Sequence, residues 1–420
     1  MTRLPVEDRG GPLAGVVVVD LTRALAGPYG TMLLADLGAY VLKVEAIGGD
    51  LTRGFGPYAE DDQDHWYGGY FQSVNRNKHS ISVDLKAPEG RDLVLELVKE
   101  ADVVVENFRP GVMERLGLSY ETLAKINPRL VYGAVRGFGD PRTGESPYVG
   151  RPSFDVVAQA IGGVMHITGE ADGPPMRFGP GIGDIFPGTL SAVGILAALV
   201  DARTTGVGRF VDVAMYDSMV ALAERSVYQY SYLGIVPGRV GNEHPVLSPF
   251  GLFRASDGWV SIGAPLDHLW RLFCELMGVP DAGTDPRFAT MSSRIAHPDE
   301  MRELIEAWTS IRSRAEIVDL LADHIPVSSV NTIEDVIEDP HTKVRNMIVD
   351  LEQPGSATTR TVVGQAIKYT GSQSHFTRGP YNGEHTKIVL SSIGYSDEQI
   401  SALHAAGAIH IQSPEGAARP

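Results

Sequence analysis

The chain has 420 residues, a length that predicts two domains rather than one ordinary core. Apolar residues make up 43% and charged residues 21%, a composition typical of a soluble globular enzyme and not of a disordered chain. The formal charge of −16 argues against a nucleic-acid partner, because binding to a duplex requires a basic surface. A phosphate ligand must then be held by a few local cations.

The chain has one cysteine, Cys274, so an internal disulfide and zinc sites built on cysteine pairs are excluded, and we expect no metal. Residues 1–11 lack an apolar signal core. The longest apolar run, about residues 190–200, is shorter than the ~20 residues of a membrane span. We therefore expect a cytoplasmic protein without a membrane partner.

The first two hundred residues alternate apolar, β-rich runs with amphipathic segments. The runs that predict buried strands are residues 15–20, 40–45, 81–85, 101–107, 130–135 and 208–215. Residues 88–100 and 113–126 have helical periodicity. Strands that alternate with helices of this length predict right-handed crossovers, and so an α/β fold with a doubly wound, mostly parallel sheet.

Residues 216–235 predict a long helix that leaves this layer, and the loop 237–249, rich in turn-forming residues, predicts a boundary. A hairpin around Ser256-Asp257-Gly258 and helical patterns at 268–278 and 299–311 follow. We therefore predict a large α/β domain from residues 1–235 and 336–420, and a smaller α+β domain from residues 236–335.

Residues 15–45 resemble a nucleotide-binding βαβ unit, but the dinucleotide fingerprint GxGxxG is incomplete. Only Gly27 and Gly30 are present, with Pro28 between them. This pattern disfavours NAD binding and favours a βαβ unit with a glycine-rich corner. Such a turn still directs helix N–H groups toward the carboxyl edge of the sheet, where anionic ligands bind.

Asp184 stands out in the segment Gly-Pro-Gly-Ile-Gly-Asp, ahead of a helix that we expect to open near Pro187. Neighbouring glycines leave its carboxylate open to a bulky substrate, and a helix N-terminus favours its anionic, nucleophilic form. An Asp that only caps the helix requires the same residue in the same place. The residues alone leave both interpretations open.

Several long motifs appear in the order found in class III CoA-transferases, among them PLAGVVVVDLTRALAGPYGTMLLADLGAYVLKVE, NRNKHSISVDLKAPEGRDL, ADVVVENFRPGVMERLGL, NPRLVYGAVRGFG, SFDVVAQAIGG, GRFVDVAMYDSM and GEHTKIVLSSIGYSDEQI. The chain thus resembles this family, which includes formyl-CoA transferase and carnitine CoA-transferase, nearly from end to end. The resemblance implies CoA transfer between carboxylic acids, with Asp184 as the nucleophile of a covalent aspartyl intermediate. It also implies an interlocked homodimer.

The resemblance also implies a set of CoA-binding residues: Leu25, Ala26, Val83, Lys86, Asn107, Phe108 and Arg115. Phe108 suits stacking on adenine, and Lys86 and Arg115 suit phosphates. A core aromatic and solvated surface cations are the alternatives. Beyond the CoA-thioester substrate we expect no cofactor. The glycines near Asp184 are the expected oxyanion donors.

Asp155 lies where the family has an active-site acid, and a helix cap is its alternative role. Formyl-CoA transferases carry Gln at the position of Leu25 and Arg at that of Ala46, and acyl-CoA racemases carry His at that of Phe154. These departures disfavour both branches, although the formyl-CoA:oxalate type, the racemase and a non-catalytic acyl-CoA-binding protein stay open.

We expect succinyl-CoA as the donor and a small dicarboxylic or branched acid as the acceptor. His244 or Arg177 is the candidate contact for a second carboxylate. A turn residue that packs beside Pro245 is the alternative for His244.

Overall fold

The computed structural model describes residues 4–6, 10–62, 65–353, 356, 358–371 and 375–412. The chain divides into two compact units: unit 1 comprises Met1–Val164, Arg177–Val227 and Lys343–Pro420, and unit 2 comprises Met165–Met176 and Tyr228–Thr342. The predicted large domain includes residues 165–176, 228–235 and 336–342, but these belong to unit 2. Segment 165–176 is bonded to unit 2 locally, since the Gly241 N–H donates to the Gly169 carbonyl at 3.0 Å.

Unit 1 is built on a seven-stranded sheet with the order β12-β3-β2-β1-β4-β5-β6. Six strands pair in parallel, and β12 pairs antiparallel with β3. The strands are β1 (Val17–Asp20), β2 (Tyr40–Glu45), β3 (His79–Val83), β4 (Val103–Glu106), β5 (Val131–Arg136), β6 (Phe210–Ala214) and β12 (Ile409–His410). The predicted α/β class with a mostly parallel sheet is confirmed.

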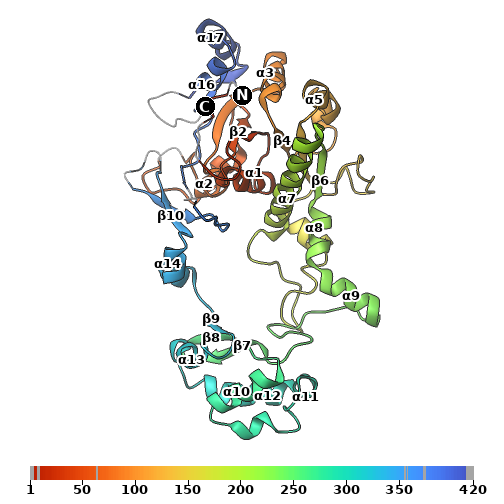
Figure 1. Ribbon diagram of the computed structural model, residues 1–420, viewed down its shortest axis with the longest axis vertical. Coiled ribbons are helices and arrows are strands. Elements are labelled where there is room, and N and C mark those ends of the chain that lie inside the picture. The colour runs from red at the N-terminus through yellow and green to blue at the C-terminus, as the bar shows by residue number, and fades with distance from the viewer. Residues whose placement is uncertain are drawn as a thin grey trace. The chain divides into compact units, whose positions relative to one another are not determined.

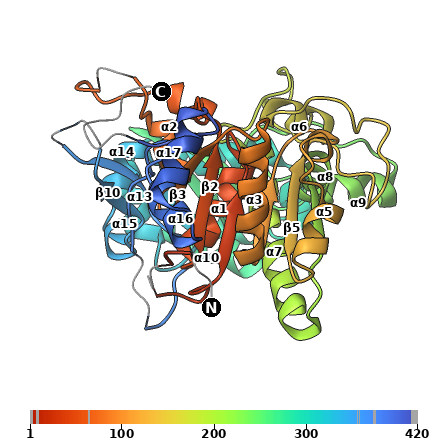
Figure 2. The same cartoon turned by 90° about the horizontal axis from the view of Figure 1, so that it is seen from above.

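Helices cover both faces of this sheet (Figure 1). Side chains alternate along β1, so that Val17 and Val19 face one apolar core and Val16 and Val18 face the other. The first core is closed by α3 (Pro88–Glu100), α5 (Tyr120–Ile126), α16 (Thr386–Ser392) and α17 (Asp397–Ala405). Figure 2 looks onto the sheet from the side of α3, α16 and α17. The second core is closed by α1 (Ala26–Asp36) and α7 (Ile182–Thr205).

The strand order reverses beside β1: the chain moves outward from β1 through β2 and β3, then crosses back to place β4 on the other side of β1. In open α/β sheets, ligands bind outside the carboxyl ends of the strands at such a reversal. The loops that follow β1 and β4 meet there, since the side-chain amide of Asn107 bonds to the backbone of Arg23.

Two predicted helices are interrupted in the structure. Segment 113–126 forms α4 (Val112–Arg115) and α5, because Gly117 adopts a positive φ of 71° and Ser119 caps α5. Segment 216–235 forms α8 (Met215–Leu222) and α9 (Glu224–Leu233). The remaining elements that lie wholly or partly in unit 1 are η1 (Leu51–Gly54), α2 (Gly69–Asn75), α6 (Asp155–Ile161), α15 (Pro340–Val344), β10 (Ile348–Leu351) and β11 (Arg360–Val363).

Unit 2 has its own apolar core between a three-stranded antiparallel sheet and helices. Its sheet contains the predicted hairpin, β7 (Phe250–Ala255) and β8 (Gly258–Gly263), with β9 (Val327–Ser329) beside β8. Its helices are α10 (Asp267–Leu276), η2 (Pro280–Gly283), α11 (Met291–Ala296), α12 (Pro298–Thr309), α13 (Arg314–Leu321) and α14 (Ile333–Glu338).

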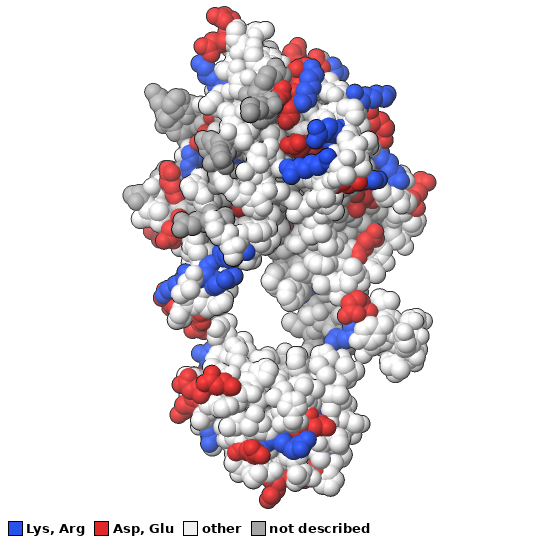
Figure 3. Space-filling model, viewed as in Figure 1, with Lys and Arg blue, Asp and Glu red and all other residues white. Residues whose placement is uncertain are grey.

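In the part of the chain that the structure describes, α7 is the one helix long and apolar enough to cross a membrane by length and composition. Its buried residues recur every three or four positions and pack against α1 and the sheet, as in the core helix of a doubly wound fold. On the face of the molecule shown in Figure 3, Lys and Arg side chains are interspersed with Asp and Glu.

Candidate active site

Asp184 lies inside the first turn of α7, not ahead of the helix. The helix begins at Ile182, so the predicted start near Pro187 is wrong by five residues. The carbonyl of Gly181 accepts from the N–H groups of Asp184, at 3.1 Å, and Ile185, at 2.9 Å. Pro187 is tolerated so near the start because it removes a single bond, the one to the carbonyl four residues earlier.

The N-terminus of α1 packs directly against this turn. A Cβ atom on Gly188 would lie 2.4 Å from the carbonyl oxygen of Ala26, and one on Gly30 would lie 2.6 Å from the carbonyl oxygen of Gly188. Only glycine permits this approach of the two backbones. The Leu25 side chain meets Gly181, three residues before Asp184. Leu25 and Ala26, which the family resemblance assigns to CoA, therefore lie at the start of α1 and next to the first turns of α7, which contain Asp184.

Asp155, the first residue of α6, contacts the same turn of α7. Its Oδ1 accepts from the Gly183 N–H at 2.8 Å, and both its oxygens accept from the side-chain amide of Gln159. Arg177 donates to Asp155 Oδ2 at 3.4 Å, with half of its side chain exposed. Asp155 therefore ties α6 to α7, and the Gly183 N–H, an expected oxyanion donor, is already used.

Gln159 is a site residue that the sequence analysis missed. It is fully buried, and its Oε1 accepts from the Phe178 N–H at 2.9 Å while its amide nitrogen donates to Asp155. The same side chain therefore fixes Asp155 and the loop that leads into α7. Its helical spacing of four residues from Asp155 is the signal that sequence reasoning offers for this pair.

The pKa of the Asp184 carboxyl is raised from 3.8 to about 7. Burial is the larger cause, and the negative charge of Asp155 is the second. The helix N-terminus was expected to favour the anion, but these two effects outweigh it. A carboxyl group that titrates near neutral pH is a common property of catalytic acids and bases.

Tyr70, on α2, is a second residue that the sequence analysis missed. The pKa of its phenol is raised by burial first and then by the negative charges of Asp184 and Asp155. The hydroxyl is therefore within electrostatic reach of Asp184. Its ring also meets Phe55 edge to face, at 5.9 Å between centroids. No motif in the chain marks this residue, because the contact depends on how α2 is held.

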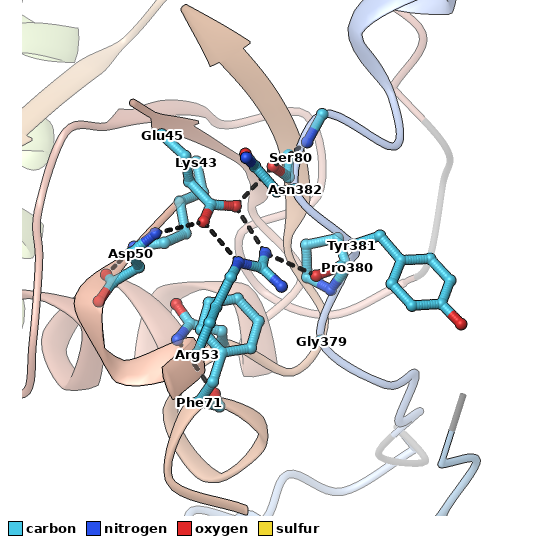
Figure 4. Close-up of polar contacts among 12 residues, drawn as sticks. Lys43, Glu45, Asp50, Arg53, Phe71, Ser80, Gly379, Pro380, Tyr381 and Asn382 are labelled. Atoms are coloured by element: carbon cyan, nitrogen blue, oxygen red, sulfur yellow. Dashed lines mark hydrogen bonds and ion pairs between the residues drawn. The ribbon is translucent and has the colours of Figure 1, made fainter. Parts of the chain in front are cut away.

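A buried ionic network holds α2 in place, and Figure 4 shows it. The guanidinium of Arg53 donates to both carboxylate oxygens of Glu45, at 2.8 and 2.7 Å, and to the carbonyl of Pro380 at 2.8 Å. It lies over the ring of Phe71, 3.7 Å from the centroid. Strand β2, helix α2 and the C-terminal segment are thus joined by one fully buried side chain.

A cavity of about 530 Å³ opens beside the carboxyl ends of β1, β2, β3 and β4. It contains three of the residues that the family resemblance assigns to CoA: Val83, Lys86 and Phe108. The full lining is Arg23, Ala46, Ile47, Gly48, Val83, Asp84, Leu85, Lys86, Phe108, Val112 and Leu116. Arg115 is not among the lining residues. It is exposed at the end of α4, between the lining residues Val112 and Leu116 in the sequence.

Asn107 is not among the lining residues but is bonded to one of them, Arg23. Its amide accepts from the Arg23 N–H and donates to the Arg23 carbonyl, both at 2.8 Å. Both ends of the amide are therefore used by the backbone of the loop before α1. This geometry favours a positioning role for the Asn107 side chain.

His244 lies in unit 2, whereas Asp184 lies in unit 1. The Val246 N–H donates to its Nδ1 at 3.3 Å, and its ring meets Phe250 edge to face, at 5.3 Å between centroids. These local contacts match the turn residue that sequence analysis weighed as the alternative. Among the described residues, no group of three or more His, Cys, Asp and Glu is placed to hold a metal ion.

A sequence model of CoA-transferase family III matches residues 13–386. The chain belongs to CoA-transferase family III. The succinyl-CoA:mesaconate CoA-transferase of Haloarcula hispanica is 49% identical over 385 residues, which cover 91% of this chain and 97% of the relative. The succinate–glutarate CoA-transferase of Agrobacterium fabrum is 37% identical over 397 residues, 94% of this chain and 98% of the relative.

The fold is also similar to a solved structure, a CAIB/BAIF family protein from Brucella suis. The two share 36% identity with a TM-score of 0.80, over 92% of this chain and all of that one. The resemblance that the motifs indicated is thus confirmed, and the family is one of enzymes that transfer CoA.

Proposed function

We propose that the protein transfers CoA from succinyl-CoA to a small dicarboxylate through a covalent intermediate on Asp184. The observation that carries this proposal is the Asp184 carboxyl group, in the first turn of α7 with a pKa of about 7. At neutral pH a large fraction of such a group is ionised, and its higher basicity makes it a better nucleophile than an ordinary carboxylate.

The proposed reaction starts when a carboxylate oxygen of Asp184 attacks the thioester carbonyl of succinyl-CoA. The carbon–sulfur bond breaks, and the CoA thiolate leaves a mixed anhydride on the enzyme. The thiolate then attacks the aspartyl carbonyl, which releases succinate and forms an aspartyl-CoA thioester. The acceptor carboxylate reverses these two steps and regenerates Asp184. One thioester replaces another, so the reaction requires no external energy source.

Each attack forms a tetrahedral oxyanion that needs hydrogen-bond donors. The N–H groups of Ala26 and Gly27 begin α1, where helix geometry provides no internal acceptor. Neither makes a hydrogen bond to another part of the described chain. The close packing of α1 on the Asp184 turn makes these two groups the preferred donors, in place of the Gly183 N–H that Asp155 occupies.

Mass spectrometry tests the covalent step. The enzyme is incubated with succinyl-CoA, treated with hydroxylamine and digested, and we expect the modification on the peptide that contains Asp184. Asp184→Asn should abolish both the modification and transfer, because the nucleophile is lost while the side-chain size is kept. Retention of a tenth of the activity by Asp184→Asn, with deamidation excluded, contradicts the mechanism.

The choice of substrates is supported by relatives that carry the names succinyl-CoA:mesaconate and succinate–glutarate CoA-transferase. A panel of donors and acceptors tests it, with succinyl-CoA and formyl-CoA as donors and mesaconate, glutarate, malate and oxalate as acceptors. We expect the highest kcat/KM for succinyl-CoA with a four- or five-carbon dicarboxylate. A preference for formyl-CoA with oxalate overturns this choice without affecting the Asp184 chemistry.

We also propose that the protein is a homodimer, as the family resemblance implies. The outer face of α7 exposes Val193 and Val200, and α9 has no buried side chain, with Tyr232 86% exposed. Figure 3 shows α9 as nearly uncharged beyond its first turn. Exposed apolar side chains on α7 and α9 are typical of a surface that a partner chain covers. Light scattering on dilution should give a dimer mass throughout, and reversible release of compact monomers contradicts an interlocked dimer.

A further inference from the structure

Arg23 lines the cavity beside the sheet reversal, and none of the motifs assigned it a role. It is exposed, and its guanidinium lies over the ring of Phe108, with 5.1 Å from the guanidinium carbon to the ring centroid. Within the described chain, the guanidinium makes no hydrogen bond or ion pair with another residue. A cation held on an aromatic face beside a cavity remains able to pair with an incoming anion.

The absence of a protein anion is informative because this chain is rich in acids, with 52 Asp and Glu against 36 Lys and Arg. Two other arginines of unit 1 have carboxylate partners: Arg53, in η1, pairs with Glu45, and Arg136, at the end of β5, pairs with Glu106. Lys86, on another wall of the same cavity, likewise makes no side-chain bond in the described part of the chain. Two cations without protein partners therefore face one mostly apolar cavity.

The backbone of Arg23 is fixed more firmly than that of an ordinary exposed loop residue. Asn107 satisfies both its N–H and its carbonyl, at 2.8 Å each. The Thr22 carbonyl accepts from the buried ammonium of Lys43 at 2.9 Å, which anchors the preceding residue. A fixed backbone loses less conformational entropy when a ligand binds, so these bonds preorganise the position from which the Arg23 side chain extends.

The cavity thus combines an aromatic ring, an apolar lining and two free cations, which suits a ligand with an aromatic base and phosphate groups. We propose that Arg23 binds a phosphate group of the CoA moiety and is a determinant of the affinity for CoA. This inference rests on the proposed function, since CoA is the ligand that the proposed reaction brings to unit 1. It adds a contact that the family-implied set does not contain.

The test measures binding of free CoA to the full-length protein by isothermal titration calorimetry, so that transfer chemistry does not enter. We expect Arg23→Ala to raise the Kd about tenfold, because a charge-assisted contact is lost. The matched control is Arg109→Ala, which removes another exposed cation of the loop after β4 that does not line the cavity. Arg109→Ala should change the Kd less than twofold.

Dephospho-CoA, which lacks the 3′-phosphate, identifies the group that Arg23 contacts. If Arg23→Ala weakens CoA binding but leaves dephospho-CoA binding unchanged, the contact is with the 3′-phosphate. If it weakens both equally, the contact is with the diphosphate. An unchanged Kd for both ligands, or an equal loss in Arg109→Ala, overturns the inference. A wild-type protein that binds no CoA refutes the proposed function itself, so the two failures are distinguishable.

Discussion

The raised pKa of Asp184 should determine how the rate of CoA transfer depends on pH. A nucleophilic carboxylate must be ionised, so kcat/KM should follow its ionisation, with a midpoint near pH 7. A single group with this pKa is about 9% ionised at pH 6 and about 91% at pH 8, so kcat/KM should rise about tenfold across this interval. Carboxyl groups in water titrate near pH 4, so the substrates' own carboxyl groups contribute little there.

The assay measures kcat/KM for succinyl-CoA from pH 5 to pH 9 at a fixed mesaconate concentration. A profile that is flat down to pH 5 would show an ordinary carboxyl group and refute the reasoning.

The same pKa shift also affects the free energy of unfolding. A carboxyl group whose pKa is raised on folding binds protons more tightly in the folded state, so its contribution to stability is fully present below pH 3.8 and is lost as the pH rises toward 7. The shift from 3.8 to about 7 corresponds to at most about 4 kcal/mol. Because Asp184 is partly exposed, screening by solvent reduces this to about 1–2 kcal/mol.

Asp184→Asn should therefore raise the free energy of unfolding more at pH 8 than at pH 4, by about 1–2 kcal/mol. Urea denaturation of both proteins at the two pH values measures this difference, in which any pH-independent effect of the amide cancels. An equal effect at pH 4 and pH 8 would falsify the assignment of the burial cost to Asp184.

Three further substitutions test the framework around Asp184, and a fourth, Arg209→Ala, is the control for one of them. Asp155→Asn removes a negative charge but keeps an acceptor for Gly183, so the midpoint of the pH profile should fall below 7; an unmoved midpoint argues against the charge effect. Arg53→Met leaves a carboxylate buried without its cation, and urea denaturation should show a loss of about 3–5 kcal/mol. Arg209→Ala, in an exposed ion pair, should leave the free energy of unfolding nearly unchanged in the same experiment. Gly188→Ala places a methyl group against a carbonyl oxygen of α1 and should cost about 1–3 kcal/mol and lower kcat, whereas wild-type values would show that α1 can shift freely.

Local signals in the sequence predicted much of the framework. Segment 88–100 is α3 to the residue, because Pro88 suits the first turn of a helix and the apolar positions 93, 94, 97 and 98 form one buried face. The hairpin around residues 256–258 follows from its turn residues. The breaks in 113–126 and 216–235 were missed, because the helical periodicity continues across them while a single turn ends each first helix.

The network around Arg53 could not be predicted, because its partners are far apart in the sequence. Glu45 is eight residues away and Pro380 is 327 residues away. Each residue alone reads as an ordinary surface charge or loop proline. Only the return of the C-terminal segment to the sheet brings them together, and the same return holds α2 and therefore Tyr70.

The pKa of Asp184 shows most clearly what a sequence leaves undecided. Asp184 was predicted to lie just ahead of a helix and lies instead in its first turn, and a helix start supplies N–H groups that favour an anion. In the structure these groups serve other acceptors: the Gly183 N–H donates to Asp155, 28 residues away in the sequence, and the N–H groups of Asp184 and Ile185 donate to Gly181. The two carboxylates therefore lie in different environments. Asp155 accepts hydrogen bonds from Gln159 and Gly183, whereas Asp184 is largely buried and is repelled by the negative charge of Asp155. Which carboxylate receives which environment depends on the packing of α6 against α7, and that packing places Asp184 where burial and the negative charge of Asp155 raise its pKa.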